Sequence, residues 1–171
     1  CGLLTDSRLI CEVAVLGANR DLPWRAPKWL YQNQIDFNYI EEWRLLDQLK
    51  AENGTLRAGD MVYRILVVDR DEPPTGPLAR RLADIEKAGM AVRYWYSSPD
   101  EGLVAGLPRD ILARPAAPDL RYVHLVKNDM DFYLLVNEGE DAIDTDLTVR
   151  CVGRAEWYDA WSNTFHKATI T

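Results

Sequence analysis

The amino-acid sequence predicts an α/β domain followed by an antiparallel β-sandwich. Strand-like and helix-like patterns alternate over residues 11–96, and such alternation is typical of a mostly parallel sheet with helices on its faces. After a proline-rich segment at 97–119 the hydrophobic period becomes two and helical patterns stop, which is typical of a sandwich of short strands. We therefore expect the α/β domain over residues 1–108 and the β-sandwich over residues 109–171.

Apolar periodicity places the elements of the first domain. The run Tyr63 to Asp69 (YRILVVD) is its clearest apolar, β-branched segment, as expected of a strand buried on both faces. The segment 78–88 carries its leucines and isoleucine at helical spacing, and Gly89 suits the helix end. A hairpin is expected around Gly59-Asp60. The other expected elements are strands at 11–17, 35–40 and 91–96, a helix at 22–34, and a short helix through residues 43–49 that ends near 53–54.

Turn residues separate the expected strands of the second domain. The segment 97–119, with its four prolines, is predicted to be a linker that contains at most one short helix. Beyond it, Asn128-Asp129, Gly153 and Ser162-Asn163 are typical turn sequences. The expected strands are at 121–126, 131–137, 143–152, 154–159 and 165–170.

Charge and apolar patterning exclude several classes of partner. The net charge is −7 and the sequence pI is near 4.9, whereas a nucleic-acid groove or an anionic membrane surface requires the opposite sign. The longest apolar runs are far too short for a transmembrane helix, and the amino terminus lacks the features of a signal peptide. We therefore expect the sequence to be a piece of a longer protein. Cys1, Cys11 and Cys151 are widely spaced and are expected to be free thiols.

A catalytic role is not indicated by any motif. The order of elements in the first domain is shared with class I glutamine amidotransferases and with flavodoxin-like sheets, but the nucleophile elbow G-x-C-x-G or G-x-S-x-G does not occur. Cys11 opens a strand without a helix amino terminus to lower its pKa, so an inert cysteine is the favoured interpretation. His124 and His166 stand in predicted strands without a nucleophile motif, and we interpret both as structural or surface residues. Neither metal nor cofactor is expected.

Carboxylates and aromatic residues give weaker signals. Asp69 and Asp71 follow a predicted parallel strand, at the sheet edge where α/β proteins usually bind ligands. The acidic run 138–146 is expected to be a solvated hairpin end. Trp157 and Trp161 can stack on sugar rings, and with Asp159 they form a candidate carbohydrate site; burial of both rings as core is nevertheless the favoured interpretation.

A family resemblance rests on the second domain. The residues are Arg121 and His124, then Asp131, Tyr133 and Asn137 in the next strand, then Glu156, Trp157 and Asp159. In this order they resemble the region after the catalytic barrel in large bacterial glycoside hydrolases of the α-L-rhamnosidase-like kind. The segments CEVAVLGAN, QNQIDFNYIEEWRL and LRAGDMVYRILVVD are similar to the amidotransferase-like domain that precedes the sandwich in such enzymes. Tyr158, Ala160 and Asn163 depart from the family pattern.

The resemblance implies a function without a catalytic residue in this chain. The family's catalytic carboxylates belong to a (β/α) barrel, expected on the amino-terminal side of Cys1, so none of them maps onto this sequence. The leading hypothesis is a non-catalytic accessory fragment of a multidomain glycoside hydrolase, whose partner is the barrel domain and which contributes to packing. Two alternatives stay open: a stand-alone carbohydrate-binding module, and an amidotransferase-like hydrolase.

Overall fold

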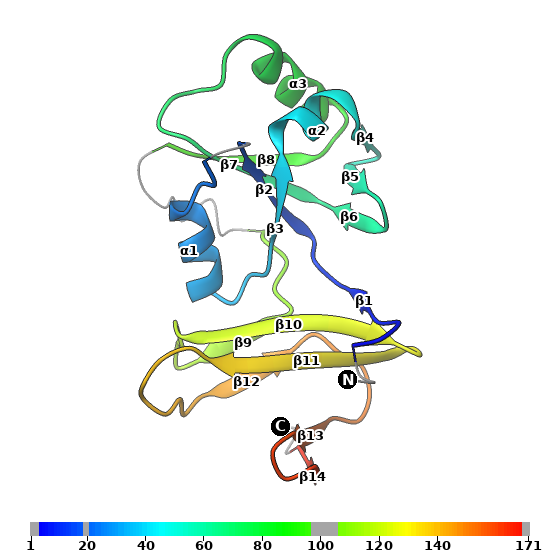
Figure 1. Cartoon of the computed structure of the whole chain (residues 1–171), viewed down its shortest axis with the longest axis vertical. Helices are drawn as coiled ribbons and strands as arrows, with labels where there is room; N and C mark the ends of the chain where they lie inside the picture. Colours follow the sequence, from blue (N-terminus) through cyan, green and yellow to red (C-terminus); the bar gives the residue numbers. More distant parts are fainter. Residues whose placement is uncertain (1–3, 19–20, 97–105, 169–171) are drawn as a thin grey trace.

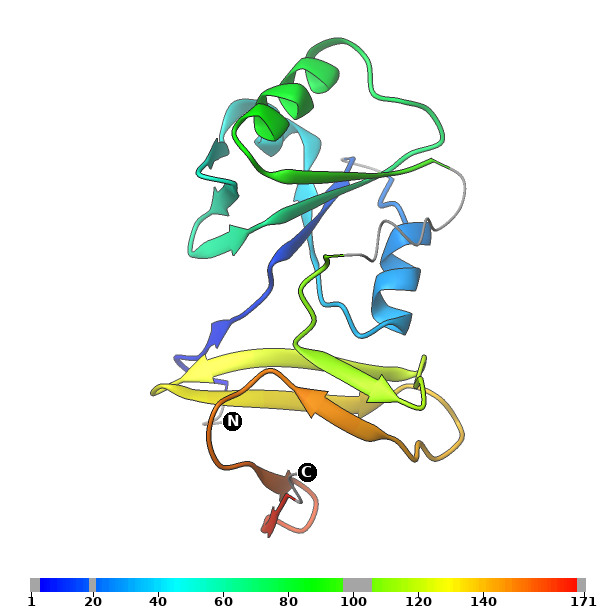
Figure 2. The same ribbon diagram turned by 180° about the vertical axis from the view of Figure 1, so that it is seen from behind.

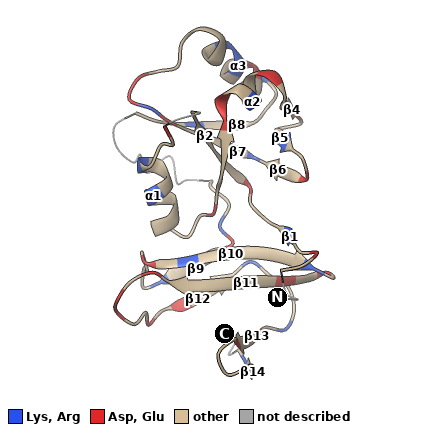
Figure 3. Ribbon diagram, in the orientation of Figure 1, with Lys and Arg blue, Asp and Glu red and all other residues tan. Residues whose placement is uncertain are grey.

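A computed structural model describes residues 4–18, 21–96 and 106–168 of the chain. It has two parts, one built around a parallel sheet with helices and one built from antiparallel strands (Figure 1). The mixed class expected from the sequence, α/β plus β, is therefore confirmed. None of the helices in these described ranges is long and apolar enough to cross a membrane. Acidic and basic residues are interspersed over both parts (Figure 3).

The first part contains a four-stranded parallel sheet in the order β3-β2-β7-β8. Every residue of the two central strands is buried, because these strands are apolar runs covered by side chains on both faces. The four strands are β2 (Val13–Gly17), β3 (Asn38–Glu41), β7 (Ile65–Asp69) and β8 (Ala91–Trp95).

Helices cover both faces of this sheet. On one face, α1 (Arg25–Gln32) buries Leu30 in a cluster with the odd-numbered residues of β2. On the other face, α2 (Glu42–Asp47) and α3 (Gly76–Lys87) pack on the even-numbered residues of β2, as Figures 1 and 2 show. Gly89 follows α3 with a φ of 88°, in the left-handed region that glycine adopts without strain.

An antiparallel meander joins α2 to β7. The expected hairpin at Gly59-Asp60 is present and connects β5 to β6. The expectation that the preceding helix continues to residues 53–54 is wrong, because α2 ends at Asp47 and Asn53-Gly54 form the turn of another hairpin, both with positive φ. The three strands are β4 (Lys50–Glu52), β5 (Thr55–Ala58) and β6 (Met61–Tyr63).

The second part is made of short antiparallel sheets. The central hairpin is β10 (Leu120–Lys127) with β11 (Met130–Asn137), and β1 (Arg8–Leu9) pairs with the other edge of β10. A two-stranded sheet of β9 (Ile111–Arg114) and β12 (Asp146–Val149) lies against one face of this hairpin (Figure 2). A last hairpin joins β13 (Glu156–Asp159) to β14 (Thr164–Lys167).

Two local expectations for this part are corrected. The segment 97–119 is not only a linker, because β9 lies within it and pairs with β12; the short helix considered there is not found in residues 106–119, and residues 97–105 lie outside the described residues, as does Cys1. The strand expected at 143–152 is limited to the four residues of β12. The strand expected at 165–170 corresponds to β14, and its last two residues are outside the described ranges.

Candidate functional site

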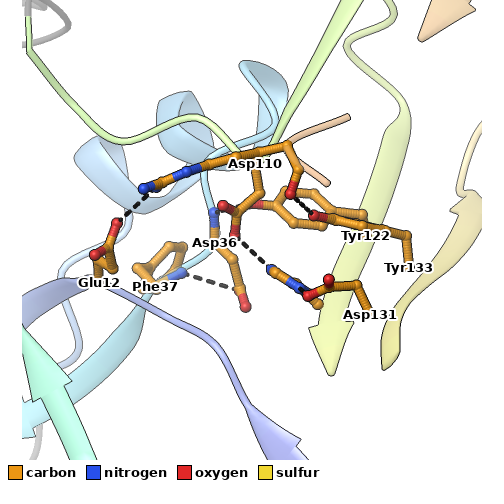
Figure 4. A network of polar contacts seen from close by, with 9 residues as sticks. Glu12, Asp36, Phe37, Asp110, Tyr122, Asp131 and Tyr133 are labelled. Atoms are coloured by element: carbon orange, nitrogen blue, oxygen red, sulfur yellow. Dashed lines mark hydrogen bonds and ion pairs between the residues drawn. The ribbon is translucent and has the colours of Figure 1, made fainter. Parts of the chain in front are cut away.

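The buried His124 side chain lies between the carboxylates of Asp110 and Asp131, two residues that Figure 4 labels. The His124 Nδ1 atom lies 3.0 Å from an Asp110 carboxylate oxygen, and its Nε2 atom lies 2.8 Å from an Asp131 oxygen. Only 7% of the His124 side chain is exposed. The three residues come from the segment before β9, from β10 and from β11, so the antiparallel fold brings them together. We call this group the His124 cluster.

The surroundings of His124 favour its protonated form. Burial lowers the pKa of His124, but hydrogen bonds and charge attraction from Asp110 and Asp131 outweigh this effect and raise it overall. The Tyr133 ring stacks on the imidazole with 4.3 Å between the ring centroids. The Tyr133 hydroxyl in turn donates a hydrogen bond of 2.7 Å to the Arg150 carbonyl. Both imidazole nitrogens are thus occupied, and the ring is fixed in orientation.

A small cavity lies beside this cluster, between the two parts. Its accessible volume is about 10 Å3, which is roughly the space that one water molecule occupies. Among its lining residues, Asp36 and Cys11 come from the first part, and Asp110 and Tyr122 come from the second. The Tyr122 hydroxyl oxygen accepts a hydrogen bond of 3.4 Å from the Asp36 backbone N–H. The cavity is therefore part of the contact surface between the two parts.

Two groups in this cavity have strongly shifted acidity. Burial raises the pKa of Asp36 to about 6, although a hydrogen bond from the Phe37 N–H opposes the shift. Burial also raises the pKa of the Cys11 thiol to about 12, and the thiol donates to the Val13 carbonyl at 3.3 Å. A thiol in this environment is protonated at neutral pH, so Cys11 lacks the thiolate that nucleophilic catalysis requires. This favours the inert cysteine expected from the sequence.

The carboxylates expected at the carboxyl edge of the parallel sheet have a structural role. Asp69 is buried and accepts hydrogen bonds from the Arg25 guanidinium at 2.9 and 3.1 Å and from the Ala26 N–H at 2.9 Å. Asp71 is exposed and pairs with the same guanidinium at 2.6 Å. Asp69 thereby anchors the first turn of α1, and its oxygens are already engaged by this chain.

The candidate carbohydrate residues lie together on the β13–β14 hairpin. Trp161 is wholly exposed and Trp157 is half-exposed, at 100% and 51%, so the expectation that both rings are buried is wrong. The Asp159 carboxylate accepts hydrogen bonds from the backbone N–H groups of Trp161 and Ser162 and from the Ser162 hydroxyl. The Ser162 hydroxyl and these N–H groups lower the pKa of Asp159. Asp159 therefore shapes the turn that presents Trp161 to solvent.

The His124 cluster was not found by reading the sequence. The turn at Asn128-Asp129 indicates a hairpin, and its register places Tyr133 opposite His124, so the proximity of Asp131 to His124 was within reach of pattern analysis. The contact between Asp110 and His124 could not be predicted in this way, because Asp110 belongs to a segment that the sequence indicates only as a linker. His166 is exposed, and its Nε2 atom lies 3.0 Å from the Thr164 hydroxyl oxygen. Within the ranges that the structure describes, no three His, Cys, Asp or Glu residues are arranged to hold a metal ion.

Comparison with known proteins gives a likeness of fold. No protein-family model and no curated protein sequence matches this chain. Among solved structures, a rhamnosidase from Novosphingobium sp. PP1Y matches 96% of this chain with a TM-score of 0.64 and 15% sequence identity. The match spans 21% of that rhamnosidase chain, so this chain corresponds to about a fifth of its length. At this identity the likeness concerns the fold of both parts together.

Proposed function

We propose that this chain is a non-catalytic accessory unit of a larger glycoside hydrolase of the α-L-rhamnosidase-like kind. The observation that carries the proposal is the match of nearly the whole chain, through both parts and their junction, to a fifth of a rhamnosidase. The resemblance of residues 121–163 to the region after the barrel in such enzymes supports it independently. Three residues of that resemblance meet in the structure, because His124 is hydrogen-bonded to Asp131 and its ring stacks on that of Tyr133.

The finer fold assignment is part of the same proposal. The strand order β3-β2-β7-β8 supports a flavodoxin-like or amidotransferase-like sheet in residues 1–108. The packing of β9 and β12 on the β10–β11 hairpin supports a β-sandwich in residues 109–171. Because β1 pairs with β10, residues 8–9 contribute to the sheet of the second part, so the two units are joined by pairing as well as by side chains.

The local chemistry favours a packing role over hydrolysis by this chain. The Cys11 thiol is protonated at neutral pH and hydrogen-bonded to the backbone, which counts against an amidotransferase-like nucleophile. The oxygens of Asp69 are engaged by Arg25 and Ala26, and both nitrogens of His124 are engaged by carboxylates. In the proposed enzyme, the catalytic carboxylates belong to a barrel outside this sequence.

Activity measurements test this proposal. The purified chain should hydrolyse neither aryl glycosides nor glutamine, whereas the full-length product of its gene should release the aglycone from an aryl α-L-rhamnoside or a related aryl glycoside. The Cys11→Ala variant of the chain serves as the control for a hidden nucleophile. Hydrolysis by the chain that this substitution abolishes would establish the amidotransferase-like alternative, and a full-length product without glycosidase activity would refute the parent assignment.

A second candidate function is carbohydrate binding by the β13–β14 hairpin. The observation that favours it is the full exposure of the Trp161 ring, held by a turn that Asp159 organises. An exposed indole can stack on the apolar face of a sugar. Titration of the chain with rhamnose-containing oligosaccharides should then change tryptophan fluorescence, and Trp161→Ala should abolish the change. Trp24→Ala, at another exposed tryptophan, is the matched control and should leave it intact.

A further inference from the structure

The β10–β11 hairpin carries apolar side chains on both of its faces. We define its outer face as Val123, Met130, Phe132, Leu134 and Val136. Four of these side chains are exposed, Val123 at 37%, Leu134 at 38%, and Met130 and Val136 at 55% each. Phe132 is half-buried. The outer face is therefore a set of large apolar side chains in contact with solvent.

Strand register makes these residues one continuous surface. Residues on β11 alternate between faces, so Met130, Phe132, Leu134 and Val136 all point the same way. Val123 stands directly opposite Leu134 in the register and joins the same surface from β10. The opposite face carries Tyr133 and Leu135, and Leu135 packs on the β9–β12 sheet. Figure 2 shows β9 and β12 on that inner side, whereas Figure 1 views the hairpin from the outer side.

This pattern differs from that of a sheet with one solvated face. Antiparallel strands that cover a core on one side normally alternate apolar and polar residues, with the polar ones in water. In β11, every outward position from Met130 to Val136 is apolar, whereas the inward positions include Asp131 and Asn137. An exposed contiguous apolar patch of this kind marks a surface that another molecule or another part of the chain covers.

The chemistry of the outer face selects a protein occupant. Its side chains are mainly aliphatic, and it lacks the Trp and Tyr rings on which sugars stack. Its ends are polar: Arg121 pairs with Glu138 at 2.9 Å, and Lys127 donates to the Thr5 carbonyl. An apolar centre with a polar rim is the usual composition of a protein interface.

We propose that the outer face of the β10–β11 hairpin is the docking surface for another part of the same, longer polypeptide. This inference rests on the proposed function, because the solved structure that matches this chain continues for about four-fifths of its length outside the match. Since β9 and β12 already cover the inner face, docking on the outer face buries the hairpin between two protein layers. The accessory unit then attaches to its parent through β11.

Footprinting with a photoactivated diazirine tests this inference. The reagent labels exposed side chains, and mass spectrometry locates the label in the purified chain and in the full-length product of its gene. The outer-face residues should be strongly labelled in the chain alone, and this labelling should be lost in the full-length protein. Equal labelling of Val123 and residues 130–136 in both forms would overturn the proposal.

A substitution pair provides the second measurement. Val136→Lys should leave the melting temperature of the isolated chain unchanged but lower that of the full-length protein, because lysine is then forced into the interface. The control is Val152→Lys, at a fully exposed valine outside this face, which should change neither melting temperature. If Val152→Lys lowers the melting temperature of the full-length protein as much as Val136→Lys does, the labelling experiment decides between the outcomes. A dimer of the isolated chain that Val136→Lys dissociates would instead identify a second copy as the occupant and overturn the proposal.

The two proposals fail separately. A full-length glycosidase whose outer face is labelled as strongly as in the isolated chain refutes docking and leaves the proposed function intact. A full-length protein in which the outer face is protected but no glycoside is hydrolysed refutes the parent activity and leaves docking intact.

Discussion

Asp36 is a carboxylate whose surroundings disfavour its ionised form. It lies where the two parts meet, in a cavity that also contains Asp110, Glu12, Cys11 and Tyr122. Burial, with a further contribution from Asp110, raises its pKa from 3.8 to about 6. Charge repulsion between Asp36 and Asp110 therefore acts across the junction when both are ionised, and the Phe37 N–H compensates for only part of the lost hydration.

The pKa of Asp36 determines the sign of a pH effect on stability. A carboxyl with a higher pKa in the folded state binds its proton more tightly when folded, so its ionisation destabilises the fold as the pH rises. This loss of folding free energy is absent below about pH 4 and grows between about pH 4 and pH 6. Above about pH 6 it is complete and amounts to roughly 3 kcal/mol. We expect Asp36→Asn to raise the free energy of unfolding by roughly 1–3 kcal/mol at pH 8 and to change little at pH 4.

Urea unfolding of both proteins at pH 4, 6 and 8 measures this difference. His124 also has a raised pKa, so it too contributes stability that is lost at higher pH, but it is present in both proteins and its effect cancels in the comparison. Asp84→Asn, at an exposed carboxylate of α3, is the control and should give no pH-dependent gain. A gain from Asp36→Asn that is equal at pH 4 and pH 8 would contradict the assignment of the shift to Asp36.

At the scale of elements, the β13–β14 hairpin differs from the other strands in having almost no core. Its residues are exposed along nearly the whole length of both strands. The rings of Tyr158 and Phe165 contact each other across the strand pair, tilted by 35° with 4.8 Å between the ring centroids, but this contact is exposed to solvent. A two-stranded hairpin alone is only marginally stable in water. The hairpin therefore contributes an exposed surface to the protein, rather than core.

Truncation of Trp161 should have little effect on folding. The ring is wholly exposed, so Trp161→Ala should change the free energy of unfolding by less than about 0.5 kcal/mol. Trp95→Ala, at a ring that is 4% exposed in the core below α1, should cost about 3 to 5 kcal/mol. Thermal melts of the two variants beside the wild type measure both values. A large loss of stability from Trp161→Ala would restore the structural role that the sequence suggested.

At the scale of the whole molecule, Gln34 joins the two parts through buried hydrogen bonds. Its side-chain amide donates to the Ala117 carbonyl at 2.7 Å and to the Leu120 carbonyl at 3.2 Å. The backbone of Gln34 is left-handed, with a φ of 50°. The segment after α1 thus turns sharply and places a polar side chain against the start of β10.

Removal of this link should loosen the junction. Gln34→Ala removes two hydrogen bonds, to the Ala117 and Leu120 carbonyls, which costs roughly 1–3 kcal/mol in total. Each carbonyl keeps a second donor, the Leu120 N–H at 3.1 Å and the Arg121 guanidinium at 3.2 Å. The left-handed backbone is equally strained with either side chain. In the Gln34→Ala protein we expect the amide hydrogens of β10 to exchange faster than those of β7. We also expect its urea unfolding transition to be broader than that of the wild type. Gln48→Ala, at an exposed glutamine after α2, should leave both unchanged. A Gln34→Ala protein whose two parts still unfold together would show that the remaining contacts suffice.

Local periodicity is enough to predict most of the elements. The strands β2 and β7 and the helix α3 follow from apolar runs and helical spacing, because a buried strand or an amphipathic helix needs that pattern in its own residues. The strand β9 did not follow, because its four residues lie among prolines and their strand geometry depends on pairing with β12. The end of α2 was also misjudged, since Asn53-Gly54 suits a hairpin turn as well as a helix end.

The sequence by itself determined the mixed fold class, because hydrophobic period and turn residues are properties of neighbouring positions. Only the tertiary structure decided which distant residues meet. Asp110 reaches His124, β1 pairs with β10, and Trp161 is left in solvent. These outcomes depend on how the two parts pack, and aromatic residues or carboxylates look the same in sequence whether a second layer covers them or water does.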